Sequence, residues 1–131
     1  MDLIADTSFL VGLWRGQSWA KQFASTNAGK SLGLPWVVLG EFWHGAMRAG
    51  HSPERIRDFL SIGLPIHDTT SVVPCYATIC SAFQSLPLWR EIGQNDLWIA
   101  ATAVAFSKPL VTRNRRHFDR VDSLRLTVLE P

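Results

Sequence analysis

Four acidic residues stand where an apolar run meets the start of a predicted helix. They are Asp6, Glu41, Asp96 and Asp119, and they are spread over most of the chain. A carboxylate among hydrophobic segments is poorly explained by solubility, because an unpaired charge is costly to bury there. If a parallel sheet brings these four points together, their side chains form an acidic pocket able to bind a divalent metal ion.

Each acid also has a simpler interpretation. Asp6 and Asp96 can act as helix N-caps, a role in which Asp is among the favoured residues. Asp119 lies in a polar, basic turn, where a salt bridge is enough to account for it. Glu41 is harder to explain, because apolar residues flank it on both sides near the apolar stripe of a predicted helix.

Taken together, the acids indicate metal-assisted chemistry. Clustered carboxylates repel and raise one another's pKa, and a divalent cation removes that cost. Mg²⁺ and Mn²⁺ prefer oxygen ligands and can stabilise charge on a phosphoryl oxygen. A basic cluster lies beside one of the acids and, apart from being a solvated loop, could contact a phosphate backbone. Its members are Lys108, Arg113, Arg115, Arg116, His117 and Arg120.

Other chemistries have little support in the residues. The chain has no Gly-rich nucleotide motif and no G-x-S-x-G elbow. Its histidines, at positions 44, 51, 67 and 117, lack the H-E-x-x-H spacing of zinc proteases. His44 follows Glu41 by three residues, and a packing or surface role is the favoured interpretation.

Short strands that alternate with helices must position the acids. Such alternation predicts an α/β layered fold with a parallel sheet covered on both faces, whose functional cleft lies at the carboxyl ends of the strands. Strands are expected at 3–5, 32–35, 62–66, 110–112 and 124–129. Helices are expected from the 6–8 cap through 13, over 19–28, 37–48 and 53–60, from the 69–71 cap to 83 or 86, and from 95 or 96 to 106. Residues 87–93 are expected to form a loop, with Trp89 and Arg90 at the rim of the site.

Composition predicts one globular domain over residues 1–131. The chain is 47% hydrophobic and 18% charged, and its net charge of +2 is too small to prove a nucleic-acid partner. Cys75 and Cys80 are spaced so that a helix turns them to different sides, which favours unpaired thiols and a reducing compartment. No secretory signal or spanning segment is recognisable, so we expect a soluble, cytoplasmic protein without a membrane partner.

The order of the motifs resembles that of PIN-domain ribonucleases, in particular the VapC-type toxins of type II toxin–antitoxin modules. The matching segments span essentially the whole chain: ADTSFLVGL at the start, LGEFWHGA, NDLWIAATAVA, and LVTRNRRHFDRV near the end. Each motif is weak alone, but four of them in order are specific. The resemblance implies a three-layer α/β/α sandwich with a short, mainly parallel sheet.

The resemblance also implies an endoribonuclease that hydrolyses RNA in a Mg²⁺ or Mn²⁺ pocket. Asp6, Glu41 and Asp96 would form the acidic triad, with Ser8 and Thr112 supporting the metal site. A fourth acid is common two residues after the threonine, but Asn114 stands there. Either Asn114 takes that place through its amide oxygen, or Asp119 replaces the missing carboxylate as a metal ligand. Substrate phosphates would be held by Arg113, Arg115 and Arg116.

Partners follow from the same resemblance: an RNA substrate, a second copy of the chain in a homodimer, and a small antitoxin. Trp14, Trp19, Trp36 and Trp43 include candidates for the antitoxin groove, although core packing explains any single one of them more simply. Two alternatives stay open. The chain could be a non-catalytic PIN-like binding module, or a Mg²⁺-dependent DNA nuclease or phosphatase that uses the same carboxylates.

Overall fold

Five short strands and seven α-helices make up the fold. The computed structural model describes residues 1–129, without the side chain of Leu88. The strands are β1 (Leu3–Ala5), β2 (Leu32–Pro35), β3 (Leu64–Ile66), β4 (Leu110–Thr112) and β5 (Leu126–Val128). The helices are α1 (Thr7–Trp14), α2 (Ser18–Thr26), α3 (Trp36–Arg48), α4 (Pro53–Leu60), α5 (Val72–Phe83), α6 (Gln94–Phe106) and α7 (Arg115–Phe118), with a 3₁₀ turn η1 (Pro87–Arg90) before α6.

All five strands pair in parallel, in the order β3-β2-β1-β4-β5. The chain therefore builds outward from β1 to β3 on one side and then crosses back to add β4 and β5 on the other. The register places Ile4 opposite Leu110 and Ala5 opposite Val111. Ligands of open parallel sheets bind at the carboxyl ends of the strands where the strand order reverses. In this sheet that point lies between β1 and β4.

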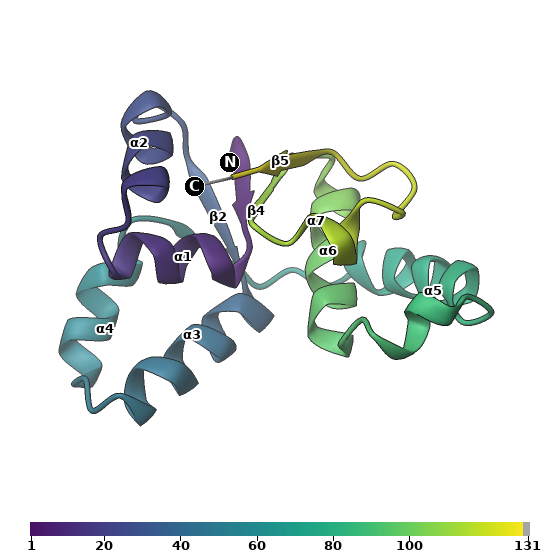
Figure 1. Cartoon of the computed structure of the whole chain (residues 1–131), viewed down its shortest axis with the longest axis horizontal. Coiled ribbons are helices and arrows are strands. Elements are labelled where there is room, and N and C mark those ends of the chain that lie inside the picture. Colours follow the sequence, from purple (N-terminus) through teal and green to yellow (C-terminus); the bar gives the residue numbers. More distant parts are fainter. Residues whose placement is uncertain (130–131) are drawn as a thin grey trace.

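Helices pack on two sides of the strands. Figure 1 shows α1, α2 and α4 grouped on one side and α5, α6 and α7 on the other, with α3 starting at the end of β2 and running toward α4. The central strands are buried throughout, as expected when both faces of a parallel sheet are covered. The α/β sandwich with a parallel sheet is thus confirmed.

Several helix ends follow local rules. Asp6 caps α1, since its side chain accepts a hydrogen bond from the backbone N–H of Thr7. Ser52 caps α4 in the same way through the N–H of Arg55, and Pro53 occupies the first helical position. The helix α2 begins after a break at Gly16, whose φ of 67° favours glycine.

Some predicted boundaries were wrong. Residues 87–90 form a 3₁₀ turn in place of a plain loop, and the basic turn after β4 contains the short helix α7. The helix that carries Asp96 begins at Gln94, one or two residues earlier than predicted, with Gly93 as its cap, so Asp96 lies in the first turn and does not cap the helix. Strand β3 starts at Leu64, because residues 61–63 close the preceding helix with backbone hydrogen bonds.

Two further expectations concern the chain as a whole. The predicted domain of residues 1–131 extends two residues past the described part. No helix within residues 1–129 combines the length and the apolar character needed to cross a bilayer.

Candidate active site

Asp6 lies at the junction of the two central strands and is tied to both. It follows β1 directly and is only 5% exposed. Its Oδ1 accepts the N–H of Thr7 at 2.8 Å. Its Oδ2 accepts hydroxyl hydrogen bonds from Ser8 at 3.0 Å and from Thr112, the last residue of β4, at 2.6 Å. The sheet therefore brings together three of the residues predicted to form the site.

The electrostatic environment of Asp6 disfavours its charged form. Burial raises the pKa of this carboxyl above its ordinary value, and the nearby negative charge of Asp96 raises it further, against the opposing effect of the hydroxyl and N–H donors. Neither of the two ion pairs found within residues 1–129 involves Asp6. A buried carboxylate with neutral donors and no protein cation is suited to binding a metal ion.

Glu41 is linked to the same network through a residue that the sequence analysis did not single out. The carboxylate lies on α3 and is half-buried. Thr7 donates its hydroxyl hydrogen to Oε1 of Glu41 at 2.7 Å. Because Thr7 is covalently next to Asp6, this bond joins the first two acids of the predicted triad. Asp6 and Ser8 were predicted to take part in the site, but Thr7 between them was interpreted only as part of the helix cap and was missed.

Asp96 meets a second residue that was missed. Its Oδ2 lies 2.7 Å from Nδ1 of His117, and the side-chain amide of Asn114 lies 2.7 Å from the same ring nitrogen. This nitrogen can donate to the carboxylate or accept from the amide, but not both at once, so His117 lies within bonding reach of Asp96 on α6 and of Asn114 in the loop after β4. In the sequence His117 counted only as part of the basic cluster, because the contact depends on the short helix α7.

The two candidates for the fourth position lie in different places. The backbone N–H of Asn114 donates to the hydroxyl of Thr112 at 3.0 Å, which keeps this residue beside Asp6. Asp119 is exposed at the C-terminal end of α7 and lines a separate hollow together with Arg120. Within residues 1–129 the Asp119 side chain makes no hydrogen bond to the other three acids.

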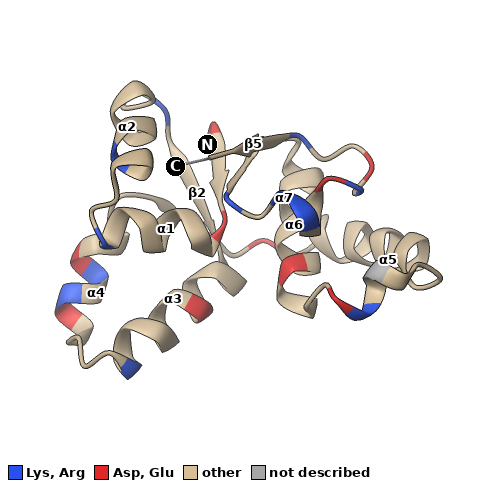
Figure 2. Ribbon diagram, in the orientation of Figure 1, with Lys and Arg blue, Asp and Glu red and all other residues tan. Residues whose placement is uncertain are grey.

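The oxygen donors fit a hard divalent ion, although they do not form a closed cage. Figure 2 shows acidic positions in red at the end of β1, on α3 and in the first turn of α6. No three His, Cys, Asp or Glu side chains of the described residues converge closely enough to enclose an ion by themselves. Mg²⁺ commonly keeps several water ligands and uses only one or two carboxylates, so this open arrangement is compatible with it.

Arg113 is separated from the other two predicted substrate arginines. Its backbone N–H donates to the Ser8 hydroxyl at 3.1 Å, and its guanidinium lies 4.4 Å from the ring centroid of Trp19 on α2. The indole lies against Gly12, where a Cβ atom would come within 2.3 Å of it. A side chain at position 12 is excluded by this contact, so Gly12 allows Trp19 to hold Arg113 beside the acidic site.

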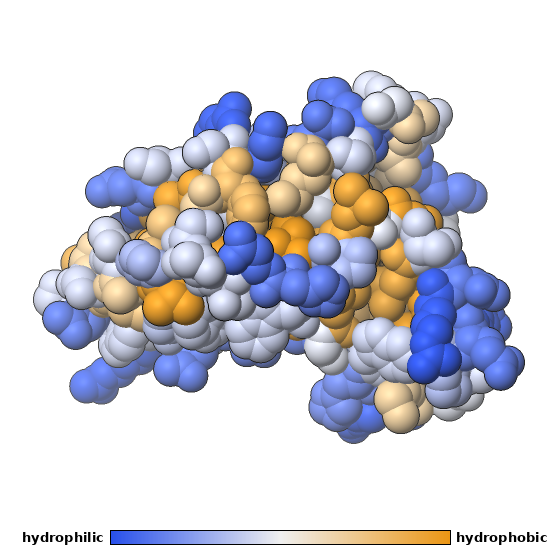
Figure 3. Space-filling model, turned by 180° about the vertical axis from the view of Figure 1, so that it is seen from behind, coloured by the Kyte–Doolittle hydropathy of each residue, from blue (hydrophilic) through white to orange (hydrophobic). Residues whose placement is uncertain are grey.

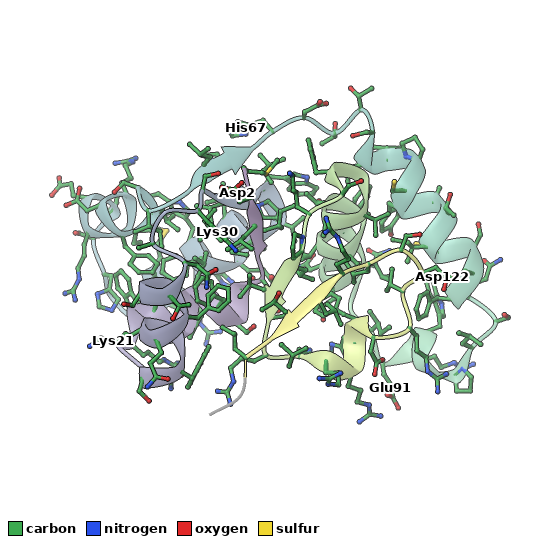
Figure 4. The ribbon with its side chains drawn as sticks, turned by 90° about the horizontal axis from the view of Figure 1, so that it is seen from above. Asp2, Lys21, Lys30, His67, Glu91 and Asp122 are labelled. Atoms are coloured by element: carbon green, nitrogen blue, oxygen red, sulfur yellow. The ribbon has the colours of Figure 1, made fainter. Side chains whose placement is uncertain are left out.

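Arg115 and Arg116 project into the hollow that also contains Asp119. This hollow has a volume of about 600 Å³ and is bordered by Pro87 and η1. Arg116 is ion-paired with Glu91, which Figure 4 shows next to α7. Both partners are largely exposed, so the pair contributes little to stability.

The four tryptophans proposed for a partner groove differ in exposure. Trp14, Trp19 and Trp43 are half-buried and pack against the core. Trp14, for example, contacts Phe42 and Phe59 edge to face. Trp36 is 45% exposed and lies at the start of α3.

Comparisons with known proteins agree with this architecture. The PIN-domain family model matches residues 3–124. The chain is 30% identical to Ribonuclease VapC1 of Rickettsia felis, covering 95% of this chain and 93% of that protein, and 31% identical to Ribonuclease VapC of Rickettsia bellii over the same shares.

Solved structures share the fold at lower identity. One is VapBC2 from Rickettsia felis bound to a promoter DNA fragment, with a TM-score of 0.80, 22% identity and coverage of 99% of this chain and 100% of that one. Another is DNA-bound VapBC from Salmonella typhimurium, with a TM-score of 0.79, 20% identity and coverage of 98% of both chains.

Proposed function

This chain belongs to the PIN-domain family and to its VapC ribonucleases, and from that membership we propose that it is a Mg²⁺- or Mn²⁺-dependent endoribonuclease, the toxin of a type II toxin–antitoxin module. The observation that carries the proposal is the Thr112–Asp6 hydrogen bond of 2.6 Å. It joins the carboxyl ends of β1 and β4 and fixes a buried, cation-free carboxylate at the reversal of strand order.

Each residue of the acidic site has a separate role in this proposal. Asp6 and Asp96 would hold the metal ion, with Ser8 and Thr112 orienting Asp6 through their hydroxyl groups. When bound, the ion supplies Lewis-acid stabilisation of charge on the scissile phosphate. Glu41, with one oxygen engaged by Thr7, positions the attacking water and takes its proton.

The fourth position belongs, in this proposal, to Asn114 and not to Asp119. The backbone of Asn114 is anchored to Thr112, and its amide lies on His117 beside Asp96. The amide oxygen can ligate the ion or orient one of its waters. His117 then acts as a positioning residue for Asp96, with the Asn114 amide beside the same ring nitrogen, while the exposed Asp119 has no part in the chemistry.

Arg113 is the arginine best placed to hold the substrate backbone at the acidic site, because it follows Thr112 directly and is oriented by Trp19. Arg115 and Arg116 would contact phosphates further along the strand, from the hollow beside η1. Such contacts add affinity without reading sequence.

The test is cleavage of single-stranded RNA by the purified protein with Mg²⁺, with Mn²⁺ and with EDTA. We expect metal-dependent products that are lost in Asp6→Asn and Asp96→Asn and retained in Asp119→Asn. Asp122→Asn, at an exposed acid of the same charge, is the matched control. Full activity of both triad variants would overturn the site, and equal cleavage of a deoxyribo-substrate would redirect the proposal to a general nuclease.

We further propose an antitoxin and a second copy of the chain as partners, in the cytoplasm. The similar solved structures are VapBC assemblies, which supports the first partner. Apolar side chains remain on the surface, and Figure 3 shows apolar patches across the middle of the rear face. Met47, Leu64 and Val73 are each more than half exposed. Sedimentation of the chain alone should give a dimer; a monomer at all concentrations would contradict it.

A further inference from the structure

A hollow separate from the one beside η1 lies on α3 next to Glu41. Its lining includes an aromatic ring, unlike the acidic site. Its volume is about 270 Å³, and Trp36, Gly40, Glu41, His44 and Asn95 contribute to its lining. Pockets for drug-sized ligands begin at about 300 Å³, so this hollow has room for roughly one planar ring system.

Trp36 forms one wall and is supported from behind by other aromatic rings. Its ring centroid lies 6.1 Å from that of Trp98 on α6, and Trp98 stacks on Tyr76 of α5 at 3.6 Å with only 5° between the planes. Trp98 and Tyr76 are both half-buried, whereas Trp36 stays 45% exposed. The indole therefore packs against a ring of α6 that is itself stacked on α5, while much of its own surface faces solvent.

Gly40 has no structural reason to be glycine. It lies inside α3, where glycine is less favourable than alanine by about 1 kcal/mol. A Cβ atom built there meets nothing within 4 Å, and its φ is not positive. Trp36, Gly40 and His44 are spaced four residues apart and so lie along one face of the helix. Without a side chain at position 40, the space between the indole and the imidazole stays open.

We propose that this hollow is a nucleobase subsite, in which one base of single-stranded RNA stacks on Trp36 next to the cleaved phosphate. Glu41 lines the hollow and also belongs to the acidic site, so a strand whose phosphate reaches the acids brings a flanking nucleotide to the indole. Stacking of bases on aromatic side chains is the usual means by which proteins bind unpaired RNA. His44 and Asn95 stand where they can hydrogen-bond the base edge. The subsite rests on the proposed ribonuclease function.

Steady-state cleavage by three variants tests the subsite. Base–aromatic stacking contributes about 1–3 kcal/mol, so Trp36→Leu should raise KM by roughly 5- to 150-fold with kcat little changed. Trp36→Phe keeps a ring and should stay near the wild type. Gly40→Leu fills the hollow, and should raise KM while the melting temperature does not fall. Ile62→Ala, at an exposed apolar residue away from the acidic site, is the control.

Substrates lacking one base identify what the hollow holds. An abasic nucleotide placed in turn at each position around the cleaved bond should, at one position, weaken wild-type cleavage as much as Trp36→Leu does. Removal of the base at that position should not weaken cleavage by Trp36→Leu any further. If the effects of the missing base and of Trp36→Leu add at every position, the subsite is wrong.

Three other outcomes also decide between these explanations. If Trp36→Leu converts a dimer to a monomer in sedimentation and loses activity in proportion, the indole belongs to an interface between copies, and the subsite is wrong. If the wild type cleaves no RNA, the proposed function itself fails. Wild-type cleavage with unchanged KM in Trp36→Leu and Gly40→Leu would overturn the subsite alone.

Discussion

Replacement of Asp6 by asparagine is expected to stabilise the metal-free protein while it abolishes cleavage. The folded-state pKa of Asp6 is raised, chiefly by burial and then by the charge of Asp96. A raised pKa means that the fold favours the protonated carboxyl. The favourable contribution of the Asp6 carboxyl to the free energy of unfolding is therefore fully present below its unfolded-state pKa of about 3.9. This contribution is lost as the pH rises through the folded-state pKa. At neutral pH the charged group destabilises the fold.

The geometry sets the size of the effect. The asparagine amide keeps an acceptor oxygen, and the hydroxyl groups of Ser8 and Thr112 can accept from its N–H, so the variant removes charge and retains hydrogen bonds. Single substitutions typically change the free energy of unfolding by about 1 kcal/mol. A gain of that size in Asp6→Asn would raise the melting temperature of a chain of this length by roughly 3–5 °C.

Thermal unfolding in EDTA at pH 7 and near pH 4 measures the difference in melting temperature between Asp6→Asn and the wild type, with Asp122→Asn as the control for an exposed acid. The higher melting temperature of Asp6→Asn should approach that of the wild type at the lower pH. Mg²⁺ should then reverse the ranking at neutral pH, because a ligand at 100 times its Kd stabilises the wild type by about 2.7 kcal/mol. A variant that melts below the wild type in EDTA at pH 7 would refute the reasoning.

Three further outcomes are expected around the same site. Thr112→Val leaves Asp6 without its shortest hydroxyl donor and should lower the free energy of unfolding in urea by about 1–3 kcal/mol, whereas Thr112→Ser should recover most of it. Gly12→Ala places a Cβ 2.3 Å from Trp19 and should be destabilising by about 1–3 kcal/mol in the same assay; a neutral result would mean that the indole moves freely. Arg113→Ala should reduce the slope of RNA affinity against salt concentration by about one, and an unchanged slope would remove this residue from the phosphate contacts.

The sequence could predict which residues of the site lie at the ends of strands. Asp6 and Thr112 each stand at the end of a short apolar run, and a parallel sheet puts such ends on one edge. The placement of these two residues needed only the strand pattern and the rule for parallel sheets. The supporting role of Ser8 was implied by the resemblance to PIN-domain ribonucleases, and the structure joins all three residues through hydrogen bonds.

Contacts that depend on how the helices pack against one another could not be predicted from the sequence. The Thr7–Glu41 bond depends on how α3 lies against α1, and no periodicity within one helix encodes the placement of another. His117 reaches Asp96 only because the predicted basic turn contains a short helix. The same helix carries Asp119 to its far end, which is why sequence distance alone left the fourth position open.

The bond between Thr112 and Asp6 spans 106 positions of sequence, so the site is among the last parts of the molecule to be assembled. Strand β1 is synthesised before β4, which can pair with it only after residues 6–109 have been made. A nascent or prematurely terminated chain that lacks β4 presents Asp6 without the neighbour that orients it. The order of synthesis thus delays the completed acidic edge until β4 has been made, and translation interrupted before β4 yields fragments without that edge.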